Sequence, residues 1–355
     1  MQPVPVVTKT RTMRSLFRFA GAELVETASE STWGFVLMGI GNHSPRITAN
    51  TIQTLFLRHL RNLLRLPQFS TFRRQSMPQL FVNRLTVIDF SYLHSVRGLV
   101  GESWQVDITL RGGLDDQGMV LDFGDVKKSV KQLIDEHFDH KLLIPERYPG
   151  LSHETRGGLL QLRFETRDGK PILHTSPPDA VTTVDTDEIT TDSLAQAIVS
   201  TLMPLMPSNV AAIDIHLWPE ASEGAYYHYS HGLKHHCGNC QRIAHGHRSK
   251  LRIQRNGQRD PSLEEAWARQ WTDIYIGTRE DVVEEQGGEM LFGYTSDQGR
   301  FLLQLPASCC YLIDTDSTVE NIAQHIADIL KKDQPGDTFR VLAYEGVDKG
   351  AIGEA

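Results

Sequence analysis

The chain has 355 residues, of which 40% are hydrophobic and 23% are charged. This composition is typical of an ordinary soluble protein with room for two domains, and no apolar run is long enough to predict a transmembrane helix. The formal net charge of −8 argues against general nucleic-acid binding, which requires a basic surface. Four cysteines, two of them adjacent (Cys309 and Cys310), do not form a disulfide framework, so we expect a cytoplasmic protein.

The positive charge is concentrated at the start of the chain. Residues 1–76 hold ten Lys or Arg and three Glu, a balance of +7, so the remainder carries −15 to reach the total of −8. The segment lacks Asp and is rich in Arg, Ser and Thr, which a targeting segment would also be. We predict a poorly ordered basic extension, with the functional chain beginning near Met77.

The first half of the remaining chain predicts strands, then helices, then strands. Alternating or β-branched runs at 80–90 and 104–110 indicate two strands. A helix follows from Val126, because apolar residues recur there at helical spacing, and a second runs from Asp192 to about Met203, where Pro204 ends it. Residues 150–190 read as an insertion with a hairpin, and strands are expected at 211–218 and 225–229.

The second half repeats this order. Two strands are expected around the histidine-rich stretch and at 249–253, helices at 261–271 and 319–330, a hairpin near 283–306 and a closing strand at 339–344. We therefore predict an α+β protein with two tandem units, 77–226 and 227–355. Each unit would be an antiparallel sheet covered by helices on one face.

A dense group of histidines and cysteines lies at the start of the second unit. Six of the chain's 15 histidines and two of its four cysteines fall between His228 and His247. His245 and His247 are two apart, so on a strand both side chains emerge on one face. With His231 from a neighbouring strand they predict an open three-histidine Zn²⁺ site, with Cys240 in the intervening loop. The alternative is a structural zinc knuckle built on Cys237 and Cys240 with two histidines.

These residues resemble a known family, the 6-pyruvoyltetrahydropterin synthases and 6-carboxytetrahydropterin synthases. Members carry a His on one strand, a loop Cys, His-Gly-His on the next strand, Asp-His after the first helix and a Glu on a late strand. The runs 118–128 (GMVLDFGDVKK) and 133–143 (LIDEHFDHKLL) look very like the family's strand-to-helix segment. The resemblance covers about 79–355 and implies two tandem tunnelling-fold (T-fold) domains.

The motif is divided between the two halves. The second half has His231, Cys240, His245, His247 and Glu345, whereas the first half keeps Asp139-His140 and Glu220 but reads Val100-Gly101-Glu102 in place of His-Gly-His. In the second half we expect Ser308-Cys309 at the place of Asp-His. In this family the Asp-His pair acts across a subunit interface, on a Cys and a metal of the neighbouring subunit. The resemblance therefore implies a working site that pairs the metal domain with the Asp-His domain.

The resemblance also implies roles for these residues. His231, His245 and His247 would hold Zn²⁺, Cys240 would act as general base, and Asp139 would orient His140. Glu345 would anchor the pterin ring through two N–H bonds, and Glu220 would either anchor a second pterin or be a relic. The substrate would be 7,8-dihydroneopterin triphosphate.

Three functions remain open at this point. The first is conversion of the substrate to 6-carboxytetrahydropterin in queuosine biosynthesis, with loss of acetaldehyde and triphosphate. The second stops at 6-pyruvoyltetrahydropterin. The third is a non-catalytic pterin-binding or structural zinc protein. We expect a small-molecule pterin partner, no nucleic acid or membrane partner, and a homo-oligomer, because T-fold sheets close into barrels by assembly.

Overall fold

The computed structural model describes residues 77–355, together with the strands β1 (Phe17–Phe19), β2 (Ala22–Ser29) and β3 (Thr32–Met38). These three strands form an antiparallel sheet within the unit Met1–Gln75, and Ser76–Ala355 is a second compact unit. Apart from these three strands, the segment 1–76, which was expected to be poorly ordered, lies outside the described residues. None of the helices described is both long and apolar enough to cross a bilayer.

The first sheet of the second unit has the strand order β10-β6-β4-β5-β11. Its members are β4 (Gln79–His94), β5 (Gly98–Gly112), β6 (Leu142–Pro145), β10 (Val181–Val184) and β11 (Val210–Pro219). The hairpin β4–β5 and the pair β5–β11 are antiparallel, whereas β6 runs parallel to β4 and β10 parallel to β6. The sheet predicted to be antiparallel is thus mixed at one edge, because β6 and β10 are reached by crossovers rather than tight turns.

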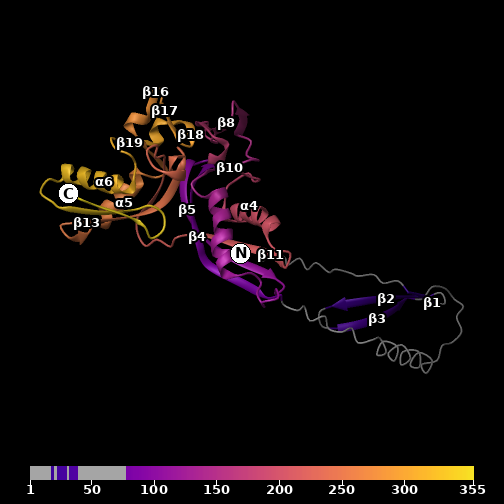
Figure 1. Ribbon diagram of the computed structural model, residues 1–355. Helices are drawn as coiled ribbons and strands as arrows, with labels where there is room; N and C mark the ends of the chain where they lie inside the picture. Colours follow the sequence, from indigo (N-terminus) through magenta and orange to yellow (C-terminus); the bar gives the residue numbers. More distant parts are fainter. Residues whose placement is uncertain (1–16, 20–21, 30–31, 39–76) are drawn as a thin grey trace, which may run out of the picture. The chain divides into compact units, whose positions relative to one another are not determined.

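Helices pack on this sheet and share one apolar core with it (Figure 1). The expected helix after residue 122 is composite: α2 (Phe123–Asp125), a π-helical turn η1 (Val126–Val130) and α3 (Lys131–Phe138). Val126, Val130 and Ile134 recur at a spacing of four and form one buried stripe of this composite helix. The helix α4 (Thr191–Leu202) begins at a capping box formed by Thr190 and Ser193.

The second sheet has the order β19-β15-β12-β13-β20-β21. Its members are β12 (Tyr226–His231), β13 (His245–Arg255), β15 (Ile274–Thr278), β19 (Cys310–Ile313), β20 (Phe339–Tyr344) and β21 (Gly350–Glu354). The helices α5 (Pro261–Gln270) and α6 (Val319–Asp333) contribute to its core. The strand β21 was not predicted from the sequence, because its short run with Gly350 and Gly353 lacks a strand pattern.

A third sheet joins the two halves. It has the order β16-β17-β18-β9-β8-β7, and the ladder between β18 and β9 crosses from one half to the other, with Leu303 opposite His174. Its strands are β7 (Leu151–Arg156), β8 (Leu159–Glu165), β9 (Pro171–Ser176), β16 (Val282–Gln286), β17 (Glu289–Ser296) and β18 (Gly299–Pro306). The two predicted insertion hairpins, one from each half, therefore build a common sheet.

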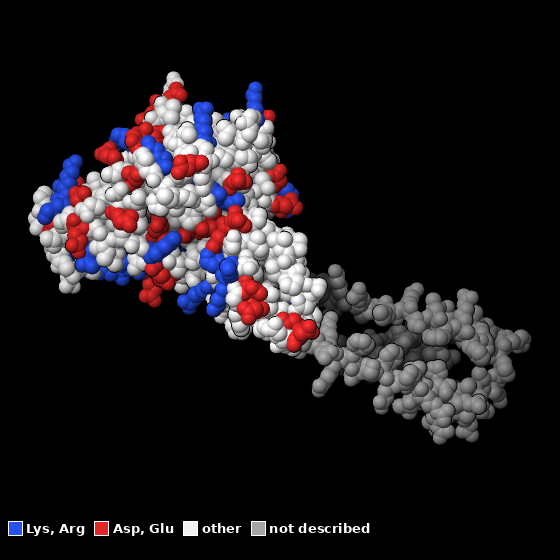
Figure 2. Space-filling model, in the orientation of Figure 1, with Lys and Arg blue, Asp and Glu red and all other residues white. Residues whose placement is uncertain are grey.

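Short elements complete the chain. They are η2 (Pro178–Ala180), η3 (Met203–Leu205), η4 (Gly238–Gln241), η5 (Arg279–Asp281), η6 (Ala307–Cys309) and β14 (Gln258–Arg259). On the face drawn in Figure 2, acidic and basic side chains are interspersed over the unit 76–355.

The first two sheets meet at a pair of glycines in equivalent positions. Gly101 pairs with Ser91 in the first sheet as Gly246 pairs with Ser230 in the second. A Cβ on Gly246 would lie 2.6 Å from the Gly101 Cα, and the two serine Oγ atoms are 2.7 Å apart. This close approach brings the ends of β12 and β13 against β4 and β5, which is where the candidate site lies.

Candidate metal centre and catalytic site

Three buried histidines converge at the end of the β12–β13 hairpin. His231 lies directly opposite His245 in the ladder, and His247 lies on the same face two residues further along. One ring nitrogen of each comes within 4.8 Å of the others, and none of the three side chains is more than 1% exposed. The predicted grouping of His231, His245 and His247 is therefore present in the structure.

The backbone contacts of two of these rings indicate which ring nitrogen carries the proton. His231 Nδ1 lies 2.9 Å from the Ser317 carbonyl oxygen and His245 Nδ1 lies 2.8 Å from the Arg242 carbonyl oxygen. A nitrogen that faces a carbonyl carries the proton, so Nε2 of each ring is the free acceptor. His231 Nε2 and His247 Nε2 are buried without a hydrogen-bond partner among the described residues, and His247 Nδ1 faces the Asp89 carboxylate at 3.3 Å.

The electrostatics of the group suit a metal ion. Burial lowers the pKa of His231 and of His245 well below the ordinary value, so both imidazoles are neutral, which is the form that binds metal. Buried nitrogens without partners are costly, and a divalent cation bound by all three would remove that cost. The donor set, three imidazoles, fits Zn²⁺ with a coordination position left open.

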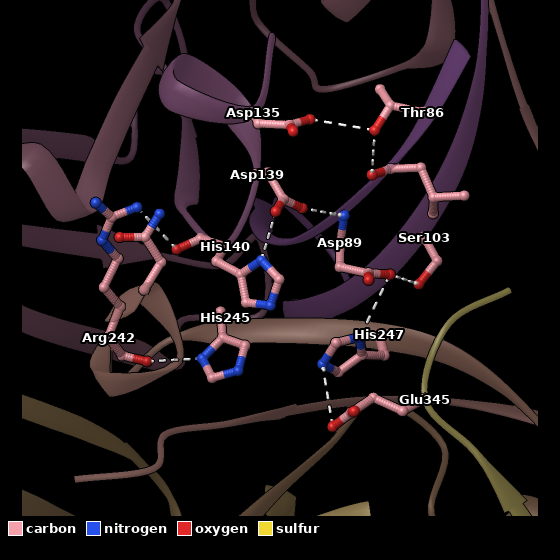
Figure 3. A network of polar contacts seen from close by, with 12 residues as sticks. Thr86, Asp89, Ser103, Asp135, Asp139, His140, Arg242, His245, His247 and Glu345 are labelled. Carbon is pink, nitrogen blue, oxygen red and sulfur yellow. Dashed lines mark hydrogen bonds and ion pairs between the residues drawn. The ribbon is translucent and has the colours of Figure 1, made fainter. Parts of the chain in front are cut away.

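Asp139 and His140 reach this cluster from the first half of the chain (Figure 3). His140 follows the end of α3 in a left-handed conformation (φ 53°), and its backbone N–H donates to the Asp89 carbonyl oxygen at 2.6 Å. Asp139 accepts from the Asp89 N–H at 2.8 Å, and its second oxygen lies 2.7 Å from His140 Nδ1. Strand β4 thus fixes both residues, and the His140 ring lies over that of His245 with centroids 5.1 Å apart.

Cys240 lies on the short turn η4 between the two strands. Its sulfur forms a group with His140 and His245 in which the three donor atoms lie within 4.8 Å of one another. Burial opposes a charge on His140, but the hydrogen bonds with Asp139 and Cys240 outweigh it and raise the His140 pKa to about 10. His140 is therefore a cation beside the Cys240 sulfur.

The two glutamates predicted to bind pterin, Glu345 and Glu220, have different surroundings. Glu345 follows β20, and its carboxylate oxygen lies 3.8 Å from His247 Nε2 with a quarter of the side chain exposed. Glu220 follows β11 and is held by Lys250, whose Nζ donates to its carboxylate at 2.6 Å. The structure brings Glu345 to the histidine cluster, whereas the contacts of Glu220 are with Lys250 and Arg248. Glu345 as pterin anchor stays a prediction, and so does either role for Glu220.

Cys237 does not join the cluster. It is exposed and is absent from the groups of metal-binding side chains found among the described residues, whereas Cys240 belongs to one of them. The geometry therefore favours the three-histidine site over the structural zinc knuckle.

The first sheet carries an altered copy of the same site. By ladder register the residues equivalent to the three histidines are Tyr92, Val100 and Glu102. Arg97 lies among them: its guanidinium donates to the Tyr92 hydroxyl at 3.1 Å and to both carboxylate oxygens of Asp273. An internal cation thus lies beside the residues that replace the ligands. His94 instead pairs with Glu188 at 3.1 Å.

One expected correspondence is wrong. Ser308-Cys309 precedes the outer strand β19, whereas Thr272-Asp273 precedes β15, the equivalent of β6. Asp273 has the left-handed backbone of His140, with φ 51°. The sequence comparison missed this because the helix α5 that precedes Asp273 carries none of the family's motif.

Sequence reasoning also missed Asp89. Its carboxylate, 4% exposed, lies 3.3 Å from His247 Nδ1 and accepts from Lys349 Nζ at 3.0 Å. No local pattern marks this aspartate, because His247 and Lys349 lie more than 150 residues along the chain.

Both halves of the chain match one family of known proteins. The family model for 6-pyruvoyl tetrahydropterin synthase matches the chain twice, over residues 87–230 and 220–352. A protein of Methanocaldococcus jannaschii named "Putative 6-carboxy-5,6,7,8-tetrahydropterin synthase" is 29% identical over 140 residues, 38% of this chain and 82% of the relative. One of the same name from Pyrococcus horikoshii is 23% identical over 133 residues, 38% of this chain and 76% of the relative.

Among solved structures, the 6-pyruvoyltetrahydropterin synthase of Plasmodium vivax matches with a TM-score of 0.34 and 17% identity, over 41% of this chain and 94% of that chain. The family model and the described sheets define a lyase-type enzyme of pterin metabolism with two T-fold domains. The chain belongs to the 6-pyruvoyl tetrahydropterin synthase family, in a tandem form.

Proposed function

We propose that the protein converts 7,8-dihydroneopterin triphosphate to 6-carboxy-5,6,7,8-tetrahydropterin, releasing acetaldehyde and triphosphate. The observation that carries this proposal is the meeting of Asp139 and His140 from one domain with Cys240 and the histidines from the other. The names of the archaeal relatives favour the carboxy product. The product would feed the biosynthesis of queuosine or a related 7-deazapurine.

Each residue of the site would have its own role in this reaction. His231, His245 and His247 would hold Zn²⁺, which would supply Lewis-acid chemistry for negative charge that develops on a substrate oxygen. Cys240 accepts a proton from the substrate's side chain, and His140 beside it stabilises the thiolate. Asp139 holds the orientation and charge of His140. Glu345 accepts two N–H bonds from the 2-amino-pyrimidine edge of the pterin, which sets the ring against the cluster.

We also infer a homo-oligomer. The strands β10 and β11 end the first sheet, and β19 and β21 end the second, among the described residues. Pairing of such edges between chains would close barrels and protect them. Light scattering of the purified chain measures its mass, and a monomer at catalytic concentrations would rule this inference out.

Product analysis tests the reaction. The zinc-loaded full chain is incubated with dihydroneopterin triphosphate, and acetaldehyde, triphosphate and the pterin product are measured. We expect acetaldehyde and the carboxy product, their loss in Cys240→Ser, and unchanged zinc content in that variant. A pyruvoyl product without acetaldehyde would select the 6-pyruvoyltetrahydropterin synthase reaction, and no turnover of any kind would leave a pterin-binding or structural zinc protein.

A further inference from the structure

The hairpin between β20 and β21 places a glutamate and a lysine opposite each other. The two strands pair with Tyr344 opposite Gly350. Glu345 and Lys349 are the next pair in that register, and the Glu345 N–H donates to the Lys349 carbonyl oxygen at 3.0 Å. Side chains directly opposite in an antiparallel pair emerge on the same face, and unlike charges placed in this way ordinarily attract each other. An ion pair between these two side chains would therefore be expected.

The lysine is instead held by the other domain. Lys349 Nζ donates to Asp89 Oδ2 at 3.0 Å, and Asp89 Oδ1 lies 3.3 Å from His247 Nδ1. Glu345 reaches the same ring from the other side, 3.8 Å from His247 Nε2 (Figure 3). Among the ion pairs of the described residues there is none between Glu345 and Lys349. The hairpin therefore presents a carboxylate and an ammonium group at the histidine cluster that are more than an ion-pair distance apart.

The ammonium group retains donors for a ligand. The Lys349 side chain is 53% exposed although its amine binds a buried carboxylate. Burial opposes the positive charge, but the carboxylates of Asp89 and Glu345 outweigh it and raise the pKa of Lys349 above the ordinary value. An ammonium group has three N–H donors, and Asp89 accepts one of them. The other two can serve a ligand that Glu345 binds.

The altered copy of the site shows the opposite arrangement. Glu220 follows β11 as Glu345 follows β20, because β11 pairs with β5 as β20 pairs with β13. At that location Lys250 Nζ donates directly to the Glu220 carboxylate at 2.6 Å. The glutamate of the altered copy is thus neutralised by a lysine. At the histidine cluster the lysine binds Asp89, and Glu345 forms no ion pair with a lysine or arginine in the described part of the chain.

We propose that Lys349 is a specificity-determining residue that recognises the 4-oxo group of the pterin ring. The proposal rests on the proposed function, in which Glu345 accepts N–H bonds from the 2-amino group and from N3. In a pterin the C4 carbonyl is adjacent to N3, so this edge of the ring presents an acceptor beside two donors. A carboxylate and an ammonium group on one hairpin match that pattern, and a hydrogen bond from an ammonium group is charge-assisted. A ring with an amino group at C4 would instead direct donors at Lys349.

Equilibrium binding to the full-length, zinc-loaded Cys240→Ser chain, which serves as the parent, tests this role without turnover. The two probes are 7,8-dihydroneopterin and its 4-amino analogue, which has the same side chain and 2-amino group. Lys349→Met removes the charge and the donors, whereas Lys349→Arg keeps both. Lys332→Met, at an exposed position near the end of α6, is the matched loss of charge elsewhere. The zinc content of each protein is measured alongside.

We expect Lys349→Met to bind the 4-oxo compound about tenfold to a hundredfold more weakly than the parent, the usual effect of losing a hydrogen bond to a charged group. Its affinity for the 4-amino compound should not decrease, because no hydrogen bond from Lys349 is lost there. Lys349→Arg and Lys332→Met should keep the parent's preference for the 4-oxo compound. The zinc content should be the same in all of these proteins.

Two results would overturn this role of Lys349 and leave the proposed function standing. One is an unchanged affinity of Lys349→Met for the 4-oxo compound. The other is an equal loss of affinity for both probes together with a lower zinc content, which would show that Lys349 only positions Asp89. A parent that binds neither probe would refute the proposed function, and the assignment of Lys349 with it.

Discussion

Asp89 contacts the histidine cluster from the other domain. It lies against His247 Nδ1, accepts from Ser103 and Lys349, and a Cβ on Gly346 would lie 2.5 Å from its oxygen. This enclosure fixes the carboxylate where it can orient the His247 ring, the arrangement in which a carboxylate supports a metal-binding imidazole.

Asp89→Asn should therefore lower the affinity for zinc by about tenfold to a hundredfold. The amide keeps the shape of the side chain but removes the charge that favours the N–H on His247 Nδ1. Competition with a chelator measures the affinity, and Asp333→Asn, an exposed carboxylate on α6, is the control. Equal zinc affinity in Asp89→Asn and the parent would show that Asp89 only supports packing.

The titration of the Glu102 carboxylate should make the stability of the protein depend on pH. This residue replaces a histidine ligand in the altered site, and burial raises its pKa to about 7, with the Ser103 N–H opposing. Between the ordinary pKa of 4.5 and that value the folded state binds more protons than the unfolded state, so the free energy of unfolding falls as pH rises.

The decrease from pH 4.5 to 7 attributable to Glu102 should be about 2–3 kcal/mol. Glu102→Gln removes this titration, so the free energy of unfolding of the variant, relative to that of the parent, should increase as pH increases across that range. Denaturant unfolding at several pH values measures the difference. A parent-to-variant difference that stays constant with pH would contradict the assignment.

The residues of the cluster that the sequence could point to are those with a local pattern. His245-Gly246-His247 and Asp139-His140 are recognisable from neighbours in sequence, and the structure brings both groups together. Asp89 and Arg97 could not be recognised, because their partners His247 and Asp273 lie in the other half of the chain. Periodicity says which face a residue occupies but not which distant strand covers that face.

At the scale of elements, the two glycines at the crossing of β5 and β13 determine how the sheets meet. A Cβ on Gly101 would lie 1.8 Å from the Tyr229 carbonyl oxygen, and one on Gly246 would lie 2.5 Å from the same atom. The obstacle is backbone, which cannot rotate away as a side chain can.

Gly101→Ala and Gly246→Ala should each lower the free energy of unfolding by about 2–3 kcal/mol or more and separate His140 from Cys240. Gly113→Ala is the matched control, because a Cβ there meets nothing within 4 Å. Thermal unfolding and turnover measure the two effects. Variants as stable and active as Gly113→Ala would mean that the sheets can part without harm to the site.

The helices and central strands were predictable because each carries its own period, as α6 does with Ile322 and Ile326 buried on one stripe. The joint sheet of β9 and β18 was not, since each hairpin alone predicts only its own turn. Pairing between elements more than 100 residues apart depends on how the domains pack, and a single strand pattern does not contain that information.

For the whole molecule, the described arrangement assembles a site from the two halves of a single chain. His140 precedes β6 in the first domain and Cys240 lies before β13 in the second, yet their donor atoms lie within 4.8 Å of each other. The equivalent location on the first sheet has no histidine at the three ligand positions, and Arg97 binds Asp273 and Tyr92 there. Of these two equivalent locations among the described residues, only the one on the second sheet keeps a cluster of three histidines.

An experiment with mixed variants distinguishes a site within one chain from a site between chains. His140→Ala damages the first domain and Cys240→Ser the second, and each alone should be inactive. If the site is built within one chain, every chain in a mixture still lacks one group, so co-expressed or co-refolded variants should stay inactive. If the site is built between chains, a fraction of the sites would combine two intact domains and turnover would return. The measurement is the turnover of dihydroneopterin triphosphate by the mixture, compared with that of the same mass of parent protein. Random pairing of subunits would restore about a quarter of the parent's turnover. Recovery to that level or more would contradict assembly within the chain, because only exchange of domains between subunits could produce it.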